Sequence, residues 1–180
     1  MKIREEEPSL RTAFTELYEE FLPRVFRYVK CRVSDVSTAE DLTSSVFEKV
    51  LVNFAKYSRD KAAFSTWIFT IARNTLIDYY RVAASKKKQT VSLEQAEERP
   101  TDALSPPEEL EKKELVEKLN RCVAQLSPEE QEIIHLRFEA ELTNREIAKV
   151  LGLSESNVGV KLYRAVRKLR DTLQGLEYAS

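Results

Sequence analysis

The stretch TNREIAKVLGLSESNVGVKLYRAVRKLR, residues Thr143–Arg170, decides how the C-terminal part of this chain folds. Its apolar residues recur every three or four positions on both sides of Gly152, which predicts two short helices joined by a tight turn. Ala148 is small enough to let the two helices approach closely. Two helices in this arrangement are typical of a DNA-binding helix-turn-helix.

The charges on the second of these helices favour DNA binding over a plain helical hairpin. A hairpin would share the apolar positions but mix charges on its outer face, whereas residues 143–170 hold seven basic and two acidic side chains. The start of a helix inserted in the major groove meets base edges, and its later residues lie near phosphates. The candidate base-edge residues are Ser156, Asn157, Val160 and Lys161, and the candidate phosphate contacts are Arg164, Arg167 and Lys168. Three further candidate DNA contacts lie at the starts of the two helices, namely Thr143, Arg145 and Ser154.

Further helices are expected on the N-terminal side of this motif. Ser127 and Glu130 have the spacing of a capping box, as do Thr143 and Glu146, and Ser105 before Pro106 resembles another helix start. The apolar positions between these signals repeat with a helical period. The sequence therefore predicts a C-terminal unit of four helices over residues 108–172.

Residues 85–107 differ in character from the sequence on either side. They lack a sustained apolar period, contain three prolines and follow the basic run Lys86–Lys88 with an acidic bias. This composition predicts a flexible linker. We interpret the acidic charge as that of a solvated linker. The alternative is that this charge has a specific electrostatic role.

The N-terminal part, residues 10–84, is expected to be a compact helical unit. Apolar residues follow a helical stripe from residue 10 to residue 29, where Pro23 predicts either two helices or a kink. Ser37 and Glu40 suggest a capping box that starts the next helix, and Phe64–Arg81 has a helical period again. Only 3 of the 180 residues are glycine, which also favours helices.

One face of the segment Phe64–Arg81 carries an aromatic ring, an amide and guanidinium groups together. Such groups can stack on unpaired bases and hold phosphates, although an aromatic stripe at helical spacing also fits a protein core. Both readings stay open from the residues alone. The face contains Trp67, Thr70, Asn74 and Arg81, with Arg73 and Asp78 beside them.

Composition excludes several other classes of protein. The net charge of -1 is a sum over segments of opposite sign. Residues 1–90, for example, hold 16 basic and 12 acidic side chains, a charge of +4. No stretch approaches the roughly 20 apolar residues of a membrane span, and no secretory signal is recognisable, so a cytoplasmic protein is expected. Cys31 and Cys122 lie far apart and His135 is the single histidine. A metal site, a cofactor and a catalytic triad are therefore not expected.

In their order along the chain, four motifs resemble the extracytoplasmic-function (ECF) sigma factors of bacterial RNA polymerase. These are AEDLTSSVF (39–47), FSTWIFTIARNTLIDYYR (64–81), LSPEEQEIIHLRF (126–138) and the helix-turn-helix. The resemblance implies an all-α fold of two small domains, sigma region 2 over 10–84 and sigma region 4 over 108–172, joined by the linker 85–107. It further implies that the first domain binds the polymerase clamp and the minus-ten promoter element, and the second the minus-thirty-five element.

The resemblance also assigns residues in the first domain. The clamp-facing helix would present Asp41, Leu42, Ser44, Ser45 and Glu48, where family members often have Gln-Glu in place of Ser44-Ser45. The segment that captures a base flipped from the non-template strand corresponds to Lys56, Tyr57, Ser58, Arg59 and Lys61, with Asp60 inside it. The promoter-facing helix would present Trp67, Arg73, Asn74, Asp78 and Arg81. In the second domain Gly159 stands where a Lys is common, which implies an altered preference for the upstream element.

By this resemblance the protein is not an enzyme and needs no cofactor. Its partners would be core RNA polymerase, through the beta-prime clamp and the beta flap, promoter DNA, and an anti-sigma factor. The alternative is a helix-turn-helix transcriptional regulator with a sensory N-terminal domain, which would show alternating strands and helices in residues 10–84 if that domain were a receiver. A hydrolytic or metal-dependent enzyme is the third class, and it lacks a nucleophile, a base and an orienting group.

Overall fold

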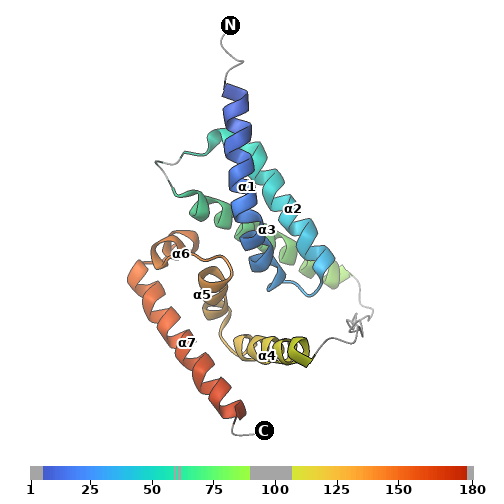
Figure 1. Ribbon diagram of the computed structural model, residues 1–180, viewed down its shortest axis with the longest axis vertical. Helices are drawn as coiled ribbons and strands as arrows, with labels where there is room; N and C mark the ends of the chain where they lie inside the picture. Colours follow the sequence, from blue (N-terminus) through green and yellow to red (C-terminus); the bar gives the residue numbers. More distant parts are fainter. Residues whose placement is uncertain (1–5, 59, 61, 90–106, 178–180) are drawn as a thin grey trace.

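The computed structural model describes residues 6–58, 60, 62–89 and 107–177. In these residues it contains seven α-helices, one short 3-10 helix and no β-strand. The predicted all-α fold is therefore confirmed. The helices form an N-terminal unit and a C-terminal unit that lie against each other (Figure 1).

The N-terminal unit consists of α1 (Glu6–Lys30), α2 (Val36–Asn53), the 3-10 helix η1 (Phe54–Lys56) and α3 (Phe64–Gln89). α1 and α2 lie side by side, and α3 crosses them (Figure 1). Their apolar stripes meet in a core of fully buried side chains, among them Val25, Val46, Ile68 and Phe69. The apolar stripes that the helical periodicity predicted are therefore the surfaces that the helices bury in this core, away from water.

The structure excludes one of the two alternatives expected at Pro23 and corrects the expected start of the next helix. Pro23 lies inside the continuous helix α1 instead of separating two helices. It is on an exposed side of that helix, where water can satisfy the carbonyl group that proline leaves unpaired. α2 is capped by Asp35, whose carboxylate accepts a hydrogen bond of 2.7 Å from the Thr38 N–H, and not by the expected pair Ser37 and Glu40. Asp35 is itself a preferred capping residue and stands two positions earlier.

The C-terminal unit consists of α4 (Pro107–Ala124), α5 (Pro128–Phe138), α6 (Asn144–Leu151) and α7 (Glu155–Glu177). The predicted four helices and both capping boxes, at Ser127 and at Thr143, are confirmed. A small core of Leu126, Ile134 and Ala165 holds α7 onto α5. The expected start at Ser105 and Pro106 lies outside the described residues.

The expected linker is only partly described. α3 continues to Gln89 and so includes the first five residues of the segment 85–107, and α4 begins at its last residue, Pro107. Residues 90–106 lie outside the described part of the chain.

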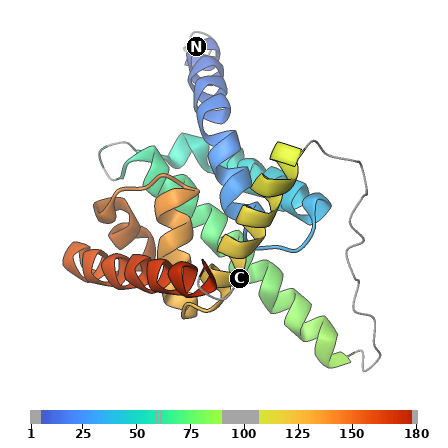
Figure 2. The same cartoon turned by 60° about the horizontal axis from the view of Figure 1, so that its bottom comes forward.

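The two units share one hydrophobic core. Ile133, Leu136 and Ile147 of the C-terminal unit belong to the same buried cluster as Val25 and Phe69 of the N-terminal unit. In both views of the ribbon, α5 and α6 lie between α7 and the N-terminal unit (Figures 1 and 2). The two units are therefore packed against each other in a closed arrangement, which the sequence patterns did not indicate.

Candidate nucleic-acid interface

The helix-turn-helix is formed by α6 and α7 around the turn at Gly152. Gly152 has φ 69°, a left-handed conformation that residues with a side chain adopt at a cost. The Ser154 hydroxyl then caps α7 by accepting a hydrogen bond of 3.2 Å from the Asn157 N–H. Ile147, Ala148 and Val158 are buried at the corner between the two helices. Local capping and the buried corner together fix the angle at which α7 leaves α6.

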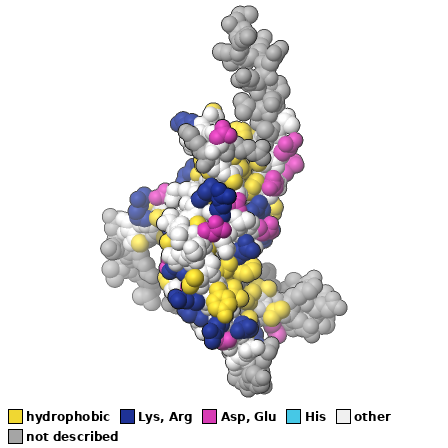
Figure 3. Space-filling model, turned by 90° about the vertical axis from the view of Figure 1, so that its left-hand side faces the viewer, with side chains coloured by type: hydrophobic (Ala, Val, Ile, Leu, Met, Phe, Trp, Pro, Cys, Tyr) yellow, Lys and Arg dark blue, Asp and Glu magenta, His cyan; other side chains and the backbone are white. Residues whose placement is uncertain are grey.

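Most of the predicted DNA-contacting residues of this motif are exposed. Val160 and the neighbouring Tyr163, Arg164 and Arg167 of α7 are all exposed. Figure 3 shows hydrophobic side chains bordered by Lys and Arg on one side of the molecule. Also exposed are Thr143, Arg145, Ser154, Ser156, Asn157 and Lys168, whereas Lys161 is half-buried. Tyr163 was not among the predicted contacts, although its position one turn after Gly159 and Val160 places it on the same face.

Two of the predicted cationic contacts are already paired within the C-terminal unit. Lys161 Nζ lies 2.7 Å from a carboxylate oxygen of Glu129, and Lys168 Nζ lies 2.6 Å from one of Glu130. Glu130 belongs to the capping box that starts α5, and the hydrogen bond from Lys168 is the main reason that its pKa is lowered to about 2. Lys168 therefore has a structural partner, whereas Arg164 is exposed.

In the N-terminal unit Tyr57, one of the described residues of the predicted base-capture segment, lies beside α3. The ring of Tyr57 stacks on the ring of Trp67, with the centroids 4.9 Å apart and an angle of 27° between the planes. The Tyr57 hydroxyl also donates a hydrogen bond to the Ala62 carbonyl oxygen at 3.1 Å. Lys56 is exposed and Ser58 is half-buried, while Arg59 and Lys61 lie outside the described residues. The structure thus brings Tyr57 and Trp67 together as a partly buried aromatic pair.

The predicted promoter-facing residues of α3 divide into two groups. Asn74, Asp78 and Arg81 are exposed on one stripe, and Arg81 donates to the Asp78 carboxylate at 2.9 Å. Arg73 lies about 100° around the helix from Asn74. Its Nε is 3.8 Å from a carboxylate oxygen of Glu132 on α5. Arg73 therefore contacts the C-terminal unit, while Asn74, Asp78 and Arg81 are exposed.

The predicted clamp-facing residues share the outer side of α2. Asp41, Ser44 and Glu48 are exposed at a spacing of three and four, and Leu42 and Ser45 are half-buried beside them. Next to Ser44 lies a groove of about 380 Å³ between α1 and α2. Its lining is Leu22, Pro23, Phe26, Glu40, Thr43 and Ser44.

Sequence reasoning missed the contacts between the two units. Glu132 of α5 is 8% exposed and binds three side chains of the N-terminal unit, namely Tyr28, Arg32 and Arg73. No local signal marks Glu132, because an acidic residue in a helix with mixed composition is normally solvent-exposed. Burial and the nearby carboxylate raise the pKa of the Tyr28 phenol well above its usual value, so Tyr28 remains a hydrogen-bond donor.

Near this contact, Cys31 and His135 also meet across the two units. Cys31 Sγ and His135 Nδ1 are 3.1 Å apart. Burial raises the pKa of the Cys31 thiol to about 12 and, together with Arg32, lowers the pKa of His135 to about 4. Both groups are therefore uncharged at neutral pH. Among the described residues, no three His, Cys, Asp or Glu side chains gather as metal ligands, and no helix is long and apolar enough to span a membrane.

Comparison with known proteins places this geometry in a family. The family model "Sigma-70 region 2" matches residues 17–86, and "Sigma-70, region 4" matches residues 117–169. The RNA polymerase sigma factor YlaC of Bacillus subtilis is 30% identical over 164 residues, which are 91% of this chain and 93% of that protein. The ECF RNA polymerase sigma factor BldN of Streptomyces coelicolor is 33% identical over 161 residues, 87% of this chain but only 59% of the longer relative.

Solved structures show the same fold. The sigma factor RpoE of Bartonella quintana, in complex with the anti-sigma factor NepR, aligns with a TM-score of 0.69 at 19% identity and covers 90% of this chain and 97% of that chain. CnrH, in complex with the cytosolic domain of CnrY, aligns with a TM-score of 0.65 at 21% identity and covers 92% and 90%.

The chain belongs to the sigma-70 family of RNA polymerase subunits that confer promoter specificity. Within that family it is a sigma factor of the ECF type, with regions 2 and 4 as its two helical units. Sigma factors as a family are not catalytic enzymes.

Proposed function

We propose that this sigma factor recognises a two-part promoter, with α7 in the major groove of the minus-thirty-five element and the outer stripe of α3 against the minus-ten element. The observation that carries the proposal is the pairing of two exposed surfaces in one chain. One is the capped helix-turn-helix with Arg164 and Arg167 outside, and the other is the stripe of Asn74, Asp78 and Arg81. A basic helix in the major groove supplies affinity through phosphates and specificity through base edges.

The same proposal assigns strand opening to the aromatic pair of the N-terminal unit. Unstacking a base costs a few kcal/mol, which a pocket and an aromatic platform must offset. Tyr57 and Trp67 already stack on each other, and the promoter-facing stripe begins about two helical turns after Trp67, at Asn74. A base taken from the non-template strand would replace part of this contact. This step requires binding energy and no bond cleavage, so we infer that the chain itself performs no catalysis.

Core polymerase is the partner that we assign to the outer side of α2. Asp41, Ser44 and Glu48 offer carboxylates and a hydroxyl, and the adjacent apolar groove beside Ser44 can take a side chain of the beta-prime clamp. The C-terminal unit would contact the beta flap. The protein would act where the polymerase is, in the cytoplasm. Because one structural neighbour is a sigma factor in complex with an anti-sigma factor, an anti-sigma factor is also proposed for this chain.

Reconstitution with core polymerase tests this function. Purified chain and core enzyme are incubated with fragmented genomic DNA of the native cell, and transcript starts are mapped by sequencing. We expect starts that share two sequence elements and that vanish when the chain is omitted. A control with Glu117→Gln, on the exposed side of α4, should give the same starts. Stable binding to core enzyme without any promoter-dependent start would overturn the proposal.

The alternative of a regulator with a sensory N-terminal domain has no observation in its favour. Residues 17–86 match sigma region 2, and the described residues of this part are helical, without the strands of a receiver domain.

A further inference from the structure

Val160 and Tyr163 are two exposed apolar residues in the first half of helix α7. Val160 is 48% exposed, and Tyr163, at 69%, is the most exposed large apolar side chain in the described part of the C-terminal unit. They stand three positions apart in one helix, so they are neighbours on its surface. Apolar residues scattered singly over a surface need no explanation, whereas an adjacent pair on a candidate binding helix does.

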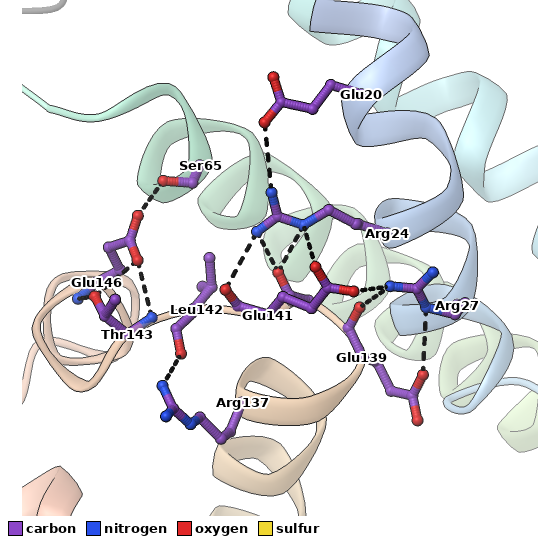
Figure 4. Close-up of polar contacts among 11 residues, drawn as sticks. Glu20, Arg24, Arg27, Ser65, Arg137, Glu139, Glu141, Leu142, Thr143 and Glu146 are labelled. Atoms are coloured by element: carbon purple, nitrogen blue, oxygen red, sulfur yellow. Dashed lines mark hydrogen bonds and ion pairs between the residues drawn. The ribbon is translucent and has the colours of Figure 1, made fainter.

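The helix-turn-helix fixes the direction in which this apolar pair points. The start of α6 is capped by Glu146, whose carboxylate accepts hydrogen bonds from the Thr143 N–H at 2.9 Å and from the Thr143 hydroxyl at 2.7 Å (Figure 4). On α7, the side chain of Val158 is fully buried in the core. Val160 and Tyr163 lie about 200° and 140° around the helix from Val158, so both are opposite the core.

The pair and its charged neighbours are available to an external ligand. In the described part of the chain, Tyr163 makes no contact with another aromatic ring, and its hydroxyl group makes no hydrogen bond. Arg164 has no ion pair among the same residues, and the nearest carboxylate to Arg167 is that of Asp171, at 3.9 Å. Apolar surface and two positive charges therefore lie next to each other without strong partners in this chain.

Gly159 lowers the surface of α7 beside the pair, and packing does not require a glycine there. An added β-carbon would meet only the side-chain nitrogen of Asn144, at 3.7 Å, which is an ordinary contact. Glycine weakens a helix relative to alanine, so folding alone does not favour it at this position. A residue without a side chain lets the edges of DNA bases come closer to the helix backbone.

Thymine is the base whose edge matches an apolar surface in the major groove. Of the four bases, only thymine presents a methyl group there, whereas the other edges present hydrogen-bond donors and acceptors. Cytosine would instead place its amino group against Val160 and Tyr163, where it has no acceptor. A protein partner is less suited to this surface, because it would have to bury Arg164 and Arg167 without a close acidic partner from this chain. Phosphates beside the base satisfy both guanidinium groups.

We propose that Val160 and Tyr163 together contact the methyl group of a thymine in the minus-thirty-five element and thereby determine the base at that position. This inference rests on the proposed function and adds to it the identity of a base. Val160 and the ring of Tyr163 cover the methyl group and exclude water from it. Ser156 and Asn157, one turn earlier and also exposed, remain available for hydrogen bonds to neighbouring base edges.

Replacement of thymine by uracil tests the inference, because it removes only the methyl group. Duplex fragments of promoters identified by transcript mapping carry deoxyuridine at one thymine of the upstream element at a time, on either strand. Binding of the full-length chain with core polymerase is measured by competition with the unmodified fragment, at a low temperature that keeps the duplex closed. We expect a three- to fivefold loss at one or two positions, which corresponds to about one buried methyl group, and no loss at the others.

Substitutions in α7 then connect the methyl group to the two side chains. In the double variant Val160→Ala/Tyr163→Ala, thymine and uracil should bind equally well at the sensitive positions. Tyr163→Phe retains the ring and should keep the preference for thymine. Leu115→Ala, at an exposed apolar position of α4, is the matched control and should keep it as well. Because all three positions are exposed, the variants should fold, and circular dichroism verifies this.

The outcomes separate this inference from the proposed function. An upstream element without any A·T pair, or one that tolerates uracil at every position, would overturn the thymine contact while promoter recognition stands. A preference for thymine that persists in the double variant would also overturn it. If that variant instead loses binding to core polymerase, the apolar pair belongs to a protein interface. If the unmodified chain gives no promoter-dependent transcript, the proposed function fails, and this inference fails with it.

Discussion

The Tyr28 hydroxyl and the Glu132 carboxylate are 2.6 Å apart, although 104 residues separate them in the sequence. Tyr28 is fully buried and its ring packs edge-on against Phe69 of α3, 5.6 Å between centroids. The phenol thus belongs to the hydrophobic core of the N-terminal unit, while its hydroxyl group reaches the C-terminal unit. Packing within one unit and attachment of the other depend on the same side chain.

Tyr28→Phe should weaken this attachment. The substitution keeps the ring but removes the donor to a buried carboxylate, and such hydrogen bonds contribute about 1–3 kcal/mol. We expect the free energy of unfolding, from urea titration followed by circular dichroism, to fall by about that amount. Tyr18→Phe, at an exposed position of α1, is the matched control. Equal losses in the two variants would mean that the Tyr28 hydroxyl has no special role.

His135 should make the stability of the protein depend on pH between 7 and 5. Burial, with Arg32 nearby, lowers its pKa from 6.5 to about 4 in the folded chain. The unfolded chain therefore takes up a proton as the pH falls through 6.5, whereas the folded chain does so only near 4, and stability is lost on acidification. By pH 5 the loss should be on the order of 1–2 kcal/mol. His135→Gln should remove this part of the pH dependence, and an unchanged profile would contradict it.

Gly152→Ala should destabilise the helix-turn-helix. At φ 69° a β-carbon costs about 1–2 kcal/mol even though no neighbouring atom lies within 4 Å of it. Gly175→Ala provides the opposite case, because Gly175 lies in helix α7 with open space around it. This variant should gain up to about 1 kcal/mol in free energy of unfolding. Thermal unfolding of both variants measures the contrast. A stability gain in Gly152→Ala would show that the turn does not need its left-handed conformation.

Arg164→Ala and Lys168→Ala should have different effects on DNA binding. Arg164 is exposed, so its loss should weaken binding to all upstream-element sequences alike. It should also reduce the salt slope, which is the slope of the logarithm of the binding constant against the logarithm of the salt concentration, by about 1. Lys168 is paired with Glu130 at 2.6 Å, so its loss should change the salt slope less and lower the melting temperature more. Fluorescence anisotropy at several salt concentrations distinguishes them. Loss confined to one DNA sequence would assign Arg164 to a base instead of a phosphate.

Trp67→Ala should impair strand opening more than binding to closed duplex promoter. The indole forms a stack with Tyr57 that a flipped base could join, whereas duplex binding depends on other residues. Permanganate footprinting reports opening, and a gel-shift assay at low temperature reports closed binding. Trp67→Phe retains a ring and should be affected less. If opening and closed binding fall together, Trp67 serves the core of the N-terminal unit only.

Much of the candidate site follows from local sequence patterns. The capping boxes at Ser127 and Thr143, the turn at Gly152 and the exposed basic side of α7 depend on residues a few positions apart, and short-range patterns report such contacts. The wrong start of α2 is also local: Asp35 and Ser37 are both good caps, and the pattern alone does not rank them.

The sequence by itself determined the helices, their buried faces and the family motifs, because helical period, capping and turn chemistry are encoded within about one turn of the chain. Only the tertiary structure decided that Arg73 pairs with Glu132, that Lys168 has a partner, and that the two units share a core. Those contacts join residues separated by dozens to more than a hundred positions, and complementary charges at such separations leave no periodic trace in the sequence.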